Sequence, residues 1–121
     1  MSRPGFSPSE IVLIKHVPLD DPSAVKARPA LIVSNSSFNA SNLDVIVVAI
    51  SSVVRPGDPR QIVLTERDCE FGETGLKMAS AIKCAAVFAY PRSEIRRRLG
   101  VVSCETLGKV RTRLIEFLTG N

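Results

Sequence analysis

The chain has 121 residues, of which 45% are hydrophobic and 23% are charged, so residues 1–121 are expected to form a single domain with its own core. This composition excludes a mainly disordered or low-complexity protein. The 16 Lys and Arg residues against 12 Asp and Glu give a net charge of +4. That charge favours an anionic partner such as nucleic acid or an acidic protein, although many small domains carry it without such a partner.

The three cysteines are Cys69, Cys84 and Cys104, an odd number without Cys-x-x-Cys spacing. They indicate neither a disulfide framework nor a zinc site. Cys84 and Cys104 lie among apolar residues and are expected to be small core residues. This cysteine usage suits a reducing cytoplasm. Because the apolar runs are shorter than the roughly 20 residues that span a bilayer, we expect a cytoplasmic protein without a membrane association.

Apolar, β-branched runs bounded by turn residues predict five strands. They are Ile11–His16, Ala30–Ser34, Asp44–Ile50, Gln61–Leu64 and Ser80–Ala89. Pro29 belongs at the start of the second strand, because proline has no N–H to donate to a ladder. The third strand is almost continuously apolar, which implies burial on both faces. The alanine-rich fifth segment also permits a helix, but its β-branched and aromatic residues favour a strand.

The connections carry turn residues, including Pro56 and Gly57 after the third strand. A polar loop is expected over Asn35–Asn42, with Phe38 as its one candidate for burial. The acidic stretch Glu66–Glu73 is expected to end in a loop around Gly72 and Gly75.

Two helical segments are expected near the C-terminus. Ser93–Leu99 predicts a helical turn that Gly100 ends. Its arginine run, Arg96 to Arg98, is expected to form a solvated helix face, with a nucleic-acid-binding patch as the less favoured alternative. The final segment is the clearest helix in the chain. Ser103 is placed as its N-cap. Its apolar residues recur at three- and four-residue spacings. They are Leu107, Val110, Leu114, Ile115 and Leu118, and Gly120 is placed to end the helix.

Strands followed by one substantial helix predict a mainly β, α+β fold. For a chain of this length, that means a small, strongly curved antiparallel sheet or partly closed barrel with the helix packed against it. The βαβ alternation of a parallel sheet and the glycine-rich phosphate loop are both missing from the sequence.

Several short sequence segments occur in an order that is typical of one protein family. They are Glu10–Ile14, Arg28–Asn35, Phe38-Asn39, Val47–Ser52, Gly75-Leu76 with Ser80, and Leu99-Gly100 before the terminal helix. In these segments, which span most of the chain, the protein resembles the PemK/MazF-like toxins of bacterial toxin–antitoxin systems. The resemblance implies an SH3-like barrel with a C-terminal helix, usually a homodimer. It also implies an endoribonuclease that cuts single-stranded RNA at short sequences without a metal or other cofactor, and a cognate antitoxin protein that neutralises it.

Metal-free RNA cleavage needs a base for the 2′-hydroxyl proton, an acid for the leaving oxygen, and a cation for the phosphoryl charge. The resemblance places Arg28 at the family's catalytic arginine, whose guanidinium can grip two phosphate oxygens. An ordinary surface ion pair is an equally weighted alternative. The resemblance also places Ser51 at a catalytic hydroxyl position. Ser52 and Ser80 are secondary candidates, and local backbone bonding is the commoner role for such serines.

Basic residues near strand ends and loops are candidates for binding the RNA backbone, with Lys26 and Lys83 foremost. The full set is Lys15, Lys26, Arg55, Lys77 and Lys83.

Two departures from the family pattern leave the general base open. The stretch Pro22–Lys26 has neither the His nor the Glu that some members carry before the arginine. Lys83-Cys84-Ala85 keeps the cation of an Arg-x-Asp motif and loses its carboxylate. Asp20 and Asp21 are alternative carboxylates, although turn formation is their commoner role. Histidine as a residue type suits acid or base work, but His16 does not align with the family's catalytic His.

The missing base also keeps a second interpretation open. The chain would then be a catalytically degenerate barrel that binds RNA or a protein target without cutting, as a relative of this barrel does when it poisons DNA gyrase.

Overall fold

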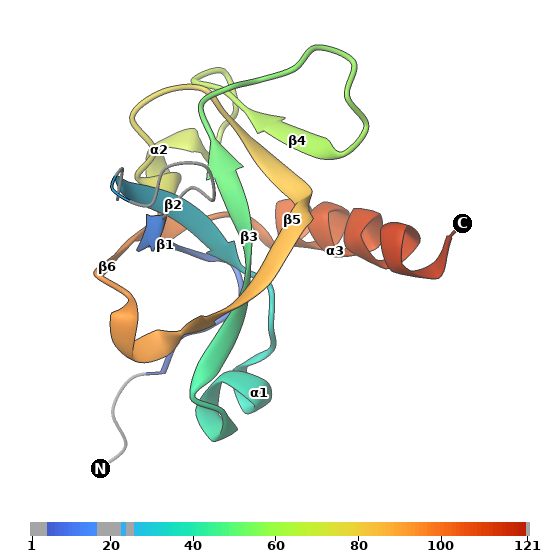
Figure 1. Cartoon of the computed structure of the whole chain (residues 1–121). Helices are drawn as coiled ribbons and strands as arrows, with labels where there is room; N and C mark the ends of the chain where they lie inside the picture. The colour runs from blue at the N-terminus through green and yellow to red at the C-terminus, as the bar shows by residue number, and fades with distance from the viewer. Residues whose placement is uncertain (1–4, 17–22, 24–25, 121) are drawn as a thin grey trace.

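The computed structural model describes residues 5–16, 23 and 26–120. In this part of the chain, six antiparallel strands form one curled sheet in the order β4-β5-β3-β2-β1-β6, and a long helix crosses it (Figure 1). The predicted mainly β fold, a curved sheet with a C-terminal helix, is confirmed.

The strands are β1 (Glu10–His16), β2 (Lys26–Ile32), β3 (Asp44–Ser51), β4 (Gln61–Leu64), β5 (Ser80–Pro91) and β6 (Arg97–Val101). The helices are α1 (Ser36–Ser41), α2 (Phe71–Thr74) and α3 (Cys104–Thr119), with a 3-10 turn η1 (Arg92–Glu94). All five predicted strands are present, and β6 is an additional one.

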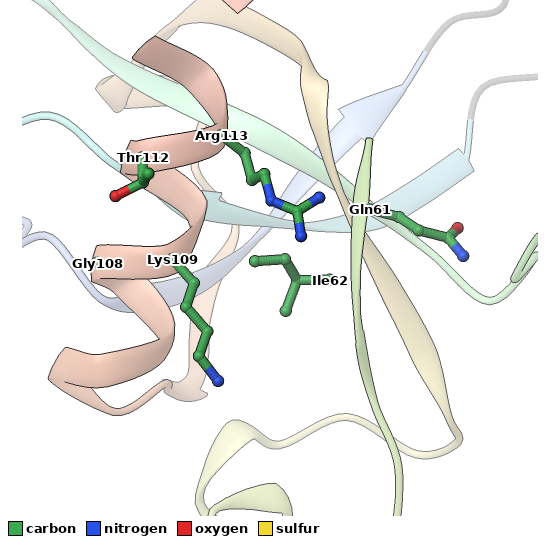
Figure 2. Close-up of a pocket in the computed structure, with 6 residues that line it drawn as sticks. All are labelled: Gln61, Ile62, Gly108, Lys109, Thr112 and Arg113. Carbon is green, nitrogen blue, oxygen red and sulfur yellow. The ribbon is translucent and has the colours of Figure 1, made fainter. Parts of the chain in front are cut away.

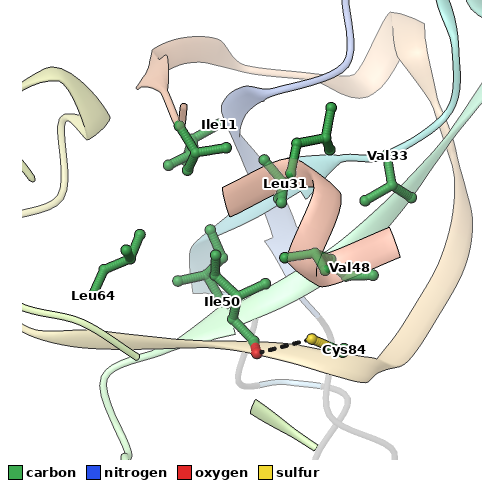
Figure 3. Close-up of a cluster of buried hydrophobic side chains, with 11 residues drawn as sticks. Ile11, Leu31, Val33, Val48, Ile50, Leu64 and Cys84 are labelled. Carbon is green, nitrogen blue, oxygen red and sulfur yellow. Dashed lines mark hydrogen bonds between the residues drawn. The ribbon is translucent and has the colours of Figure 1, made fainter. Parts of the chain in front are cut away.

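The sheet buries apolar side chains on both faces. One core lies between the sheet and α3, where Leu107 and Val110 of the helix meet side chains from β1 to β5 (Figure 3). The other core lies on the opposite face, where β1, β2 and β3 pack with Phe6, Tyr90 and Ile95. Strand β3 supplies Val48 to the first core and Val47 to the second, which confirms its predicted burial on both faces.

Helix α3 begins and ends where the sequence predicts. The Ser103 hydroxyl accepts a hydrogen bond from the Thr106 backbone N–H at 3.1 Å, and Gly120 ends the helix in the left-handed conformation at φ 78°. The carboxylate of Glu70 adds a second cap, because it accepts bonds from the Ser103 N–H and the Thr106 hydroxyl, both at 2.5 Å. Burial raises the pKa of Glu70, but these hydrogen bonds outweigh it, and the net pKa is lowered.

The predicted start of β2 is wrong. The strand begins at Lys26, so Pro29 lies inside it instead of at its start. The reason is that β2 pairs with β1 from Lys26 onward, whereas its pairing with β3 reaches only to Ala30. Pro29 therefore lies beyond the last β2–β3 pair, where the missing N–H costs little.

The predicted loop at Asn35–Asn42 contains α1, because the Asn35 side chain caps it by accepting from the Phe38 N–H at 2.8 Å. The expectation that Phe38 is buried is also wrong, since Phe38 is 36% exposed and Asn39 is 1% exposed. The Asn39 amide donates to the carbonyl oxygens of Phe6 and Ser34 at 2.9 and 3.0 Å. A polar side chain can occupy this buried position because its hydrogen bonds are made inside the protein.

The predicted helical turn at Ser93–Leu99 is mostly wrong. Only η1 is helical, and Arg97 and Arg98 belong to β6, which pairs with β1. The Arg98 guanidinium lies 2.6 Å from a Glu10 carboxylate oxygen and 4.5 Å from the centre of the Phe6 ring. The arginine run thus follows an edge strand and not a helix face.

Two smaller expectations also change. The acidic stretch that was expected to end in a loop contains the short helix α2. Cys84 is buried as expected, but Cys104 is exposed because it lies in the first turn of α3 on the solvent side.

Two glycines that are far apart in sequence bring α2 and β6 into contact. A Cβ atom on Gly100 would overlap the backbone of Glu73 and Thr74, and one on Gly75 would overlap the backbone of Leu99. Gly75 also takes the left-handed conformation, with φ 74°. Only glycine permits this approach, since the obstructing atoms belong to the main chain.

We therefore expect Gly100→Ala to lower the free energy of unfolding by at least about 2 kcal/mol, because backbone must move to admit the methyl group. Gly108→Ala, in the exposed middle of α3 with open space around its Cα, is the matched control. It should raise that free energy by about 1 kcal/mol through helix propensity. Urea unfolding followed by circular dichroism measures both, and equal stabilities of the two variants would contradict the close approach.

Candidate functional site

Arg28 and Ser51 lie at the same end of two neighbouring strands. The last β2–β3 pair at this end joins Ala30 and Ala49. Arg28 lies two residues before Ala30, and Ser51 lies two residues after Ala49. Because side chains alternate along a strand, both point to the same face as that pair. The start of β2 and the end of β3 both lie in the upper half of the molecule (Figure 1).

Each of these two side chains is accessible. Arg28 is exposed and has no ion-pair partner among the described residues. Ser51 is half-buried, and its hydroxyl oxygen accepts a hydrogen bond from the Val53 N–H at 3.0 Å. This is the local backbone role expected of a strand-end serine. A hydroxyl that accepts such a bond still has its own proton to donate.

The other candidate residues have different surroundings. Lys26 at the start of β2 and Ser52 after β3 are exposed. Ser80 is buried, and its hydroxyl donates to the Met78 carbonyl oxygen at 2.9 Å, so it satisfies local backbone. Lys83 lies on β5 opposite Ala49, and its ammonium donates to the Gln61 side-chain oxygen at 3.0 Å. Because Ala49 shares a face with Ser51, Lys83 lies on that face as well.

The loop between β3 and β4 forms a shallow pocket beside Lys83. The pocket has a volume of about 360 Å³ and is lined by Arg55, Asp58, Arg60, Lys83, Ala85 and Ala86. The Asp58 carboxylate accepts hydrogen bonds from the Arg60 side chain at 3.0 and 3.1 Å and from its backbone N–H at 2.9 Å. These bonds lower the pKa of Asp58 from 3.8 to about 2. A carboxylate held ionised in this way is a poor proton acceptor near neutral pH.

A larger hollow of about 600 Å³ lies between β4 and α3 (Figure 2). Ile62 points into it toward the helix, whereas the Gln61 side chain points away. Ile62 pairs with Ile82 of the core under α3. This hollow is therefore on the opposite face of the sheet from Arg28 and Ser51.

The structure does not describe the side chains of the residues that the sequence suggested as general bases. Asp20 and Asp21 lie outside the described residues. For His16, the structure describes the backbone, which pairs with Lys26 at the end of β1. Cys84 beside Lys83 is buried, and this burial raises the pKa of its thiol, so the thiolate is disfavoured.

Neither a metal cluster nor a membrane-spanning helix is found in the part of the chain that the structure describes. There, no three His, Cys, Asp or Glu side chains are grouped so that they could hold a metal ion. No helix in the same residues is long and apolar enough to cross a membrane.

The described residues form a small protein with one curled β-sheet, and the end of this sheet formed by β2 and β3 carries the accessible side chains of Arg28 and Ser51. The family model of the PemK-like, MazF-like toxin of type II toxin–antitoxin systems matches residues 7–118. The chain therefore belongs to the PemK/MazF-like toxin family, as the sequence resemblance indicated.

Solved structures of this family share the fold. A mycobacterial endoribonuclease in complex with its cognate antitoxin has a TM-score of 0.72 at 22% identity, covering 94% of this chain and 95% of that one. A chain of a MazE–MazF structure from Deinococcus radiodurans has a TM-score of 0.76 at 18% identity, covering 96% and 97%. A MazF toxin from Mycobacterium tuberculosis has a TM-score of 0.69 at 19% identity, covering 91% and 96%. No curated protein matches the sequence at a significant level.

The Asp58–Arg60 contact leads to a test by titration. Arg60→Ala should raise the pKa of Asp58 from about 2 toward 3.8, because it removes the hydrogen bonds from the guanidinium. Since folding lowers this pKa, the contribution of Asp58 to stability is complete above pH 3.8 and is lost as the pH falls toward 2.

Carbon-detected NMR of the Asp58 carboxyl group measures this titration directly. Arg67→Ala, which removes an exposed arginine from the next turn, should leave the pKa of Asp58 at about 2. An unchanged pKa in Arg60→Ala would show that another group lowers it.

Proposed function

We propose that this protein is the toxin of a type II toxin–antitoxin system and a sequence-specific endoribonuclease that cleaves single-stranded RNA. The observation that carries the proposal is the position of Arg28 and Ser51 at the same end and on the same face of β2 and β3. A phosphate that lies across this end of the two strands meets a guanidinium and a hydroxyl together.

In the proposed reaction, the 2′-hydroxyl of one nucleotide attacks the adjacent phosphorus and the 5′-oxygen of the next nucleotide leaves. Arg28 binds the non-bridging phosphate oxygens through its fork of N–H groups. Negative charge on these oxygens increases as the fifth bond to phosphorus forms. The Arg28 contact is therefore stronger in the transition state than in the bound substrate, which is the condition for catalysis.

Ser51 supports the same phosphate as a hydrogen-bond donor. Its oxygen already accepts from the Val53 N–H, which fixes the oxygen at the strand end while the hydroxyl proton points elsewhere. A serine hydroxyl is a weak base, so we assign it to binding and not to proton abstraction.

The proton acceptor comes from outside this pair. Asp58 is unsuitable because its pKa is about 2. Asp20 and Asp21, which precede β2 in the sequence, are the carboxylates that we assign as candidates for this role.

The proposal includes the partners that the family relationship suggests. The mycobacterial and Deinococcus relatives were solved together with an antitoxin or MazE, which supports a cognate antitoxin for this chain. We further propose that the protein acts in the cytoplasm as a homodimer.

A second candidate function is an RNA- or protein-binding barrel that does not cleave. It is favoured by Asp58, the carboxylate that lines the pocket beside Lys83. Because the pKa of Asp58 is lowered to about 2, this carboxylate is a poor proton acceptor for the reaction. Under this alternative, Arg28 contributes to binding alone.

The test is digestion of a mixed single-stranded RNA by the purified, antitoxin-free protein in EDTA, with cut sites mapped by primer extension. We expect discrete cuts whose rate falls by about 100-fold or more in Arg28→Ala, because a charged contact to the reacting phosphate is lost. Arg28→Lys should recover part of this loss, since it keeps the charge but not the two-point contact. Ser51→Ala should have a smaller effect.

The control for this digestion is Arg67→Ala, which removes an exposed arginine from the Thr65–Asp68 turn and should cut at the wild-type rate. Intact RNA after incubation with folded wild-type protein would contradict the nuclease proposal. RNA binding that weakens in Arg28→Ala without any cleavage would support the second candidate.

A further inference from the structure

Gln61 is a buried polar side chain beside the proposed site, and the nuclease proposal gives it no role. It is 8% exposed, although it opens the edge strand β4. Its amide oxygen accepts from the Arg55 N–H at 3.2 Å, and its amide nitrogen donates to the Arg55 carbonyl oxygen at 2.6 Å. The side chain therefore pairs with the Arg55 backbone in both directions, as a neighbouring strand would.

The same amide oxygen also accepts from the Lys83 ammonium at 3.0 Å. Gln61 and Lys83 are direct cross-strand partners, so their side chains meet on one face. An ammonium has three donors, and this bond occupies one of them. Because the amide is neutral, it orients Lys83 without neutralising its positive charge, whereas a carboxylate in this position would neutralise it.

The pocket around Lys83 has an excess of positive charge. Arg55, Arg60 and Lys83 line it against the single carboxylate of Asp58, which leaves a net charge of +2. Asp58 is already bound by Arg60 through two hydrogen bonds. The charges of Arg55 and Lys83 are thus available to an anion that enters the pocket.

The loop that holds these cations is fixed in place. Residues 55–58 form a turn in which the Asp58 N–H donates to the Arg55 carbonyl at 3.2 Å, with Gly57 at φ 76°. Proline followed by a left-handed glycine is the pattern of a type II turn. Arg113 of α3 donates to the Pro59 carbonyl oxygen from the other side. The backbone that carries Arg55 and Arg60 is consequently positioned before any ligand binds.

We propose that this pocket is a second phosphate subsite for the RNA backbone, next to the phosphate at Arg28, and that Gln61 is its positioning residue. The register supports the connection, because Lys83 is opposite Ala49 and Ser51 is two residues further along β3 on the same face. The subsite rests on the proposed RNA substrate. It adds binding energy outside the reacting bond, so it acts on KM and little on kcat.

The test measures binding of a pool of random single-stranded 2′-O-methyl RNA, which lacks the attacking hydroxyl and is not cut. Affinity is measured by fluorescence anisotropy between 50 and 200 mM salt. In Lys83→Gln, the slope of log K against log salt should fall by about 0.7, the value for one phosphate contact on a single strand. Gln61→Met keeps the net charge but should lower the slope by a similar amount, since Lys83 is no longer held.

The double variant separates a positioning role from a general structural one. If Gln61 acts through Lys83, adding Gln61→Met to Lys83→Gln changes affinity little, because the shared contact is already lost. Thermal unfolding of every variant checks that it folds. If Gln61→Met fails to fold, Arg55→Ala provides the second measurement, since Arg55 is an exposed residue whose side chain lines the pocket.

Lys109→Ala is the charge-matched control, because Lys109 lines the hollow between β4 and α3 on the other face. It should leave the slope unchanged. Salt slopes of Lys83→Gln and Gln61→Met that equal that of Lys109→Ala would overturn the proposal, as would a wild-type protein that does not bind the pool at 50 mM salt.

Parallel digestion of unmodified RNA distinguishes this inference from the nuclease proposal. Cleavage that depends on Arg28, combined with unchanged salt slopes in the Lys83 and Gln61 variants, would refute the subsite alone. Lower slopes in those variants without cleavage by the wild-type protein would support the subsite and refute the nuclease activity.

Discussion

The pairing register of β2 with β3 is the constraint on which the proposed site depends. A shift of one residue would turn every side chain of β2 to the other face, and Arg28 would then point toward the side that α3 covers. The two cores prevent this shift, because Leu31 is buried with α3 on one face while Ala30 and Ile32 are buried on the other. The same packing that stabilises the sheet therefore decides which face carries the guanidinium and the Ser51 hydroxyl.

A β-bulge in β5 places Lys83 beside the loop between β3 and β4. Val48 pairs with Val87, but the next residue, Ala49, pairs with Lys83, so residues 84–86 leave the ladder between them. The Cys84 N–H instead donates to the Arg60 carbonyl at 2.9 Å. The bulge thus ties the β3–β4 loop to β5 and presents Lys83 beside the loop cations. Bulges commonly redirect a side chain next to a functional site in this way.

The sequence predicted the parts of the fold that repeat a pattern. Strands β1 and β3 to β5 and helix α3 follow from apolar periodicity and capping residues, and Ser103 and Gly120 bound the helix as expected. Short elements were missed, because one turn of helix in α1 or α2 has no periodicity to detect. The burial of Asn39 in place of Phe38 follows from hydrogen bonds to Phe6 and Ser34, which only the folded chain brings together. The catalytic roles of Arg28 and Ser51 were assigned through the family resemblance, whereas Gln61 gave no signal because its contacts with Arg55 and Lys83 exist only in the folded structure.

The central claim is that Arg28 and Ser51 bind a phosphate that the RNA's own 2′-hydroxyl attacks. Mass spectrometry of the RNA fragments produced in EDTA tests this most directly, because the route of attack determines the chemistry of the new ends. Internal attack predicts 2′,3′-cyclic phosphate and 5′-hydroxyl ends that form about 100-fold more slowly, or slower still, with Arg28→Ala. Fragments with 3′-hydroxyl and 5′-phosphate ends, or the same fragments at the same rate from Arg28→Ala, would contradict the claim.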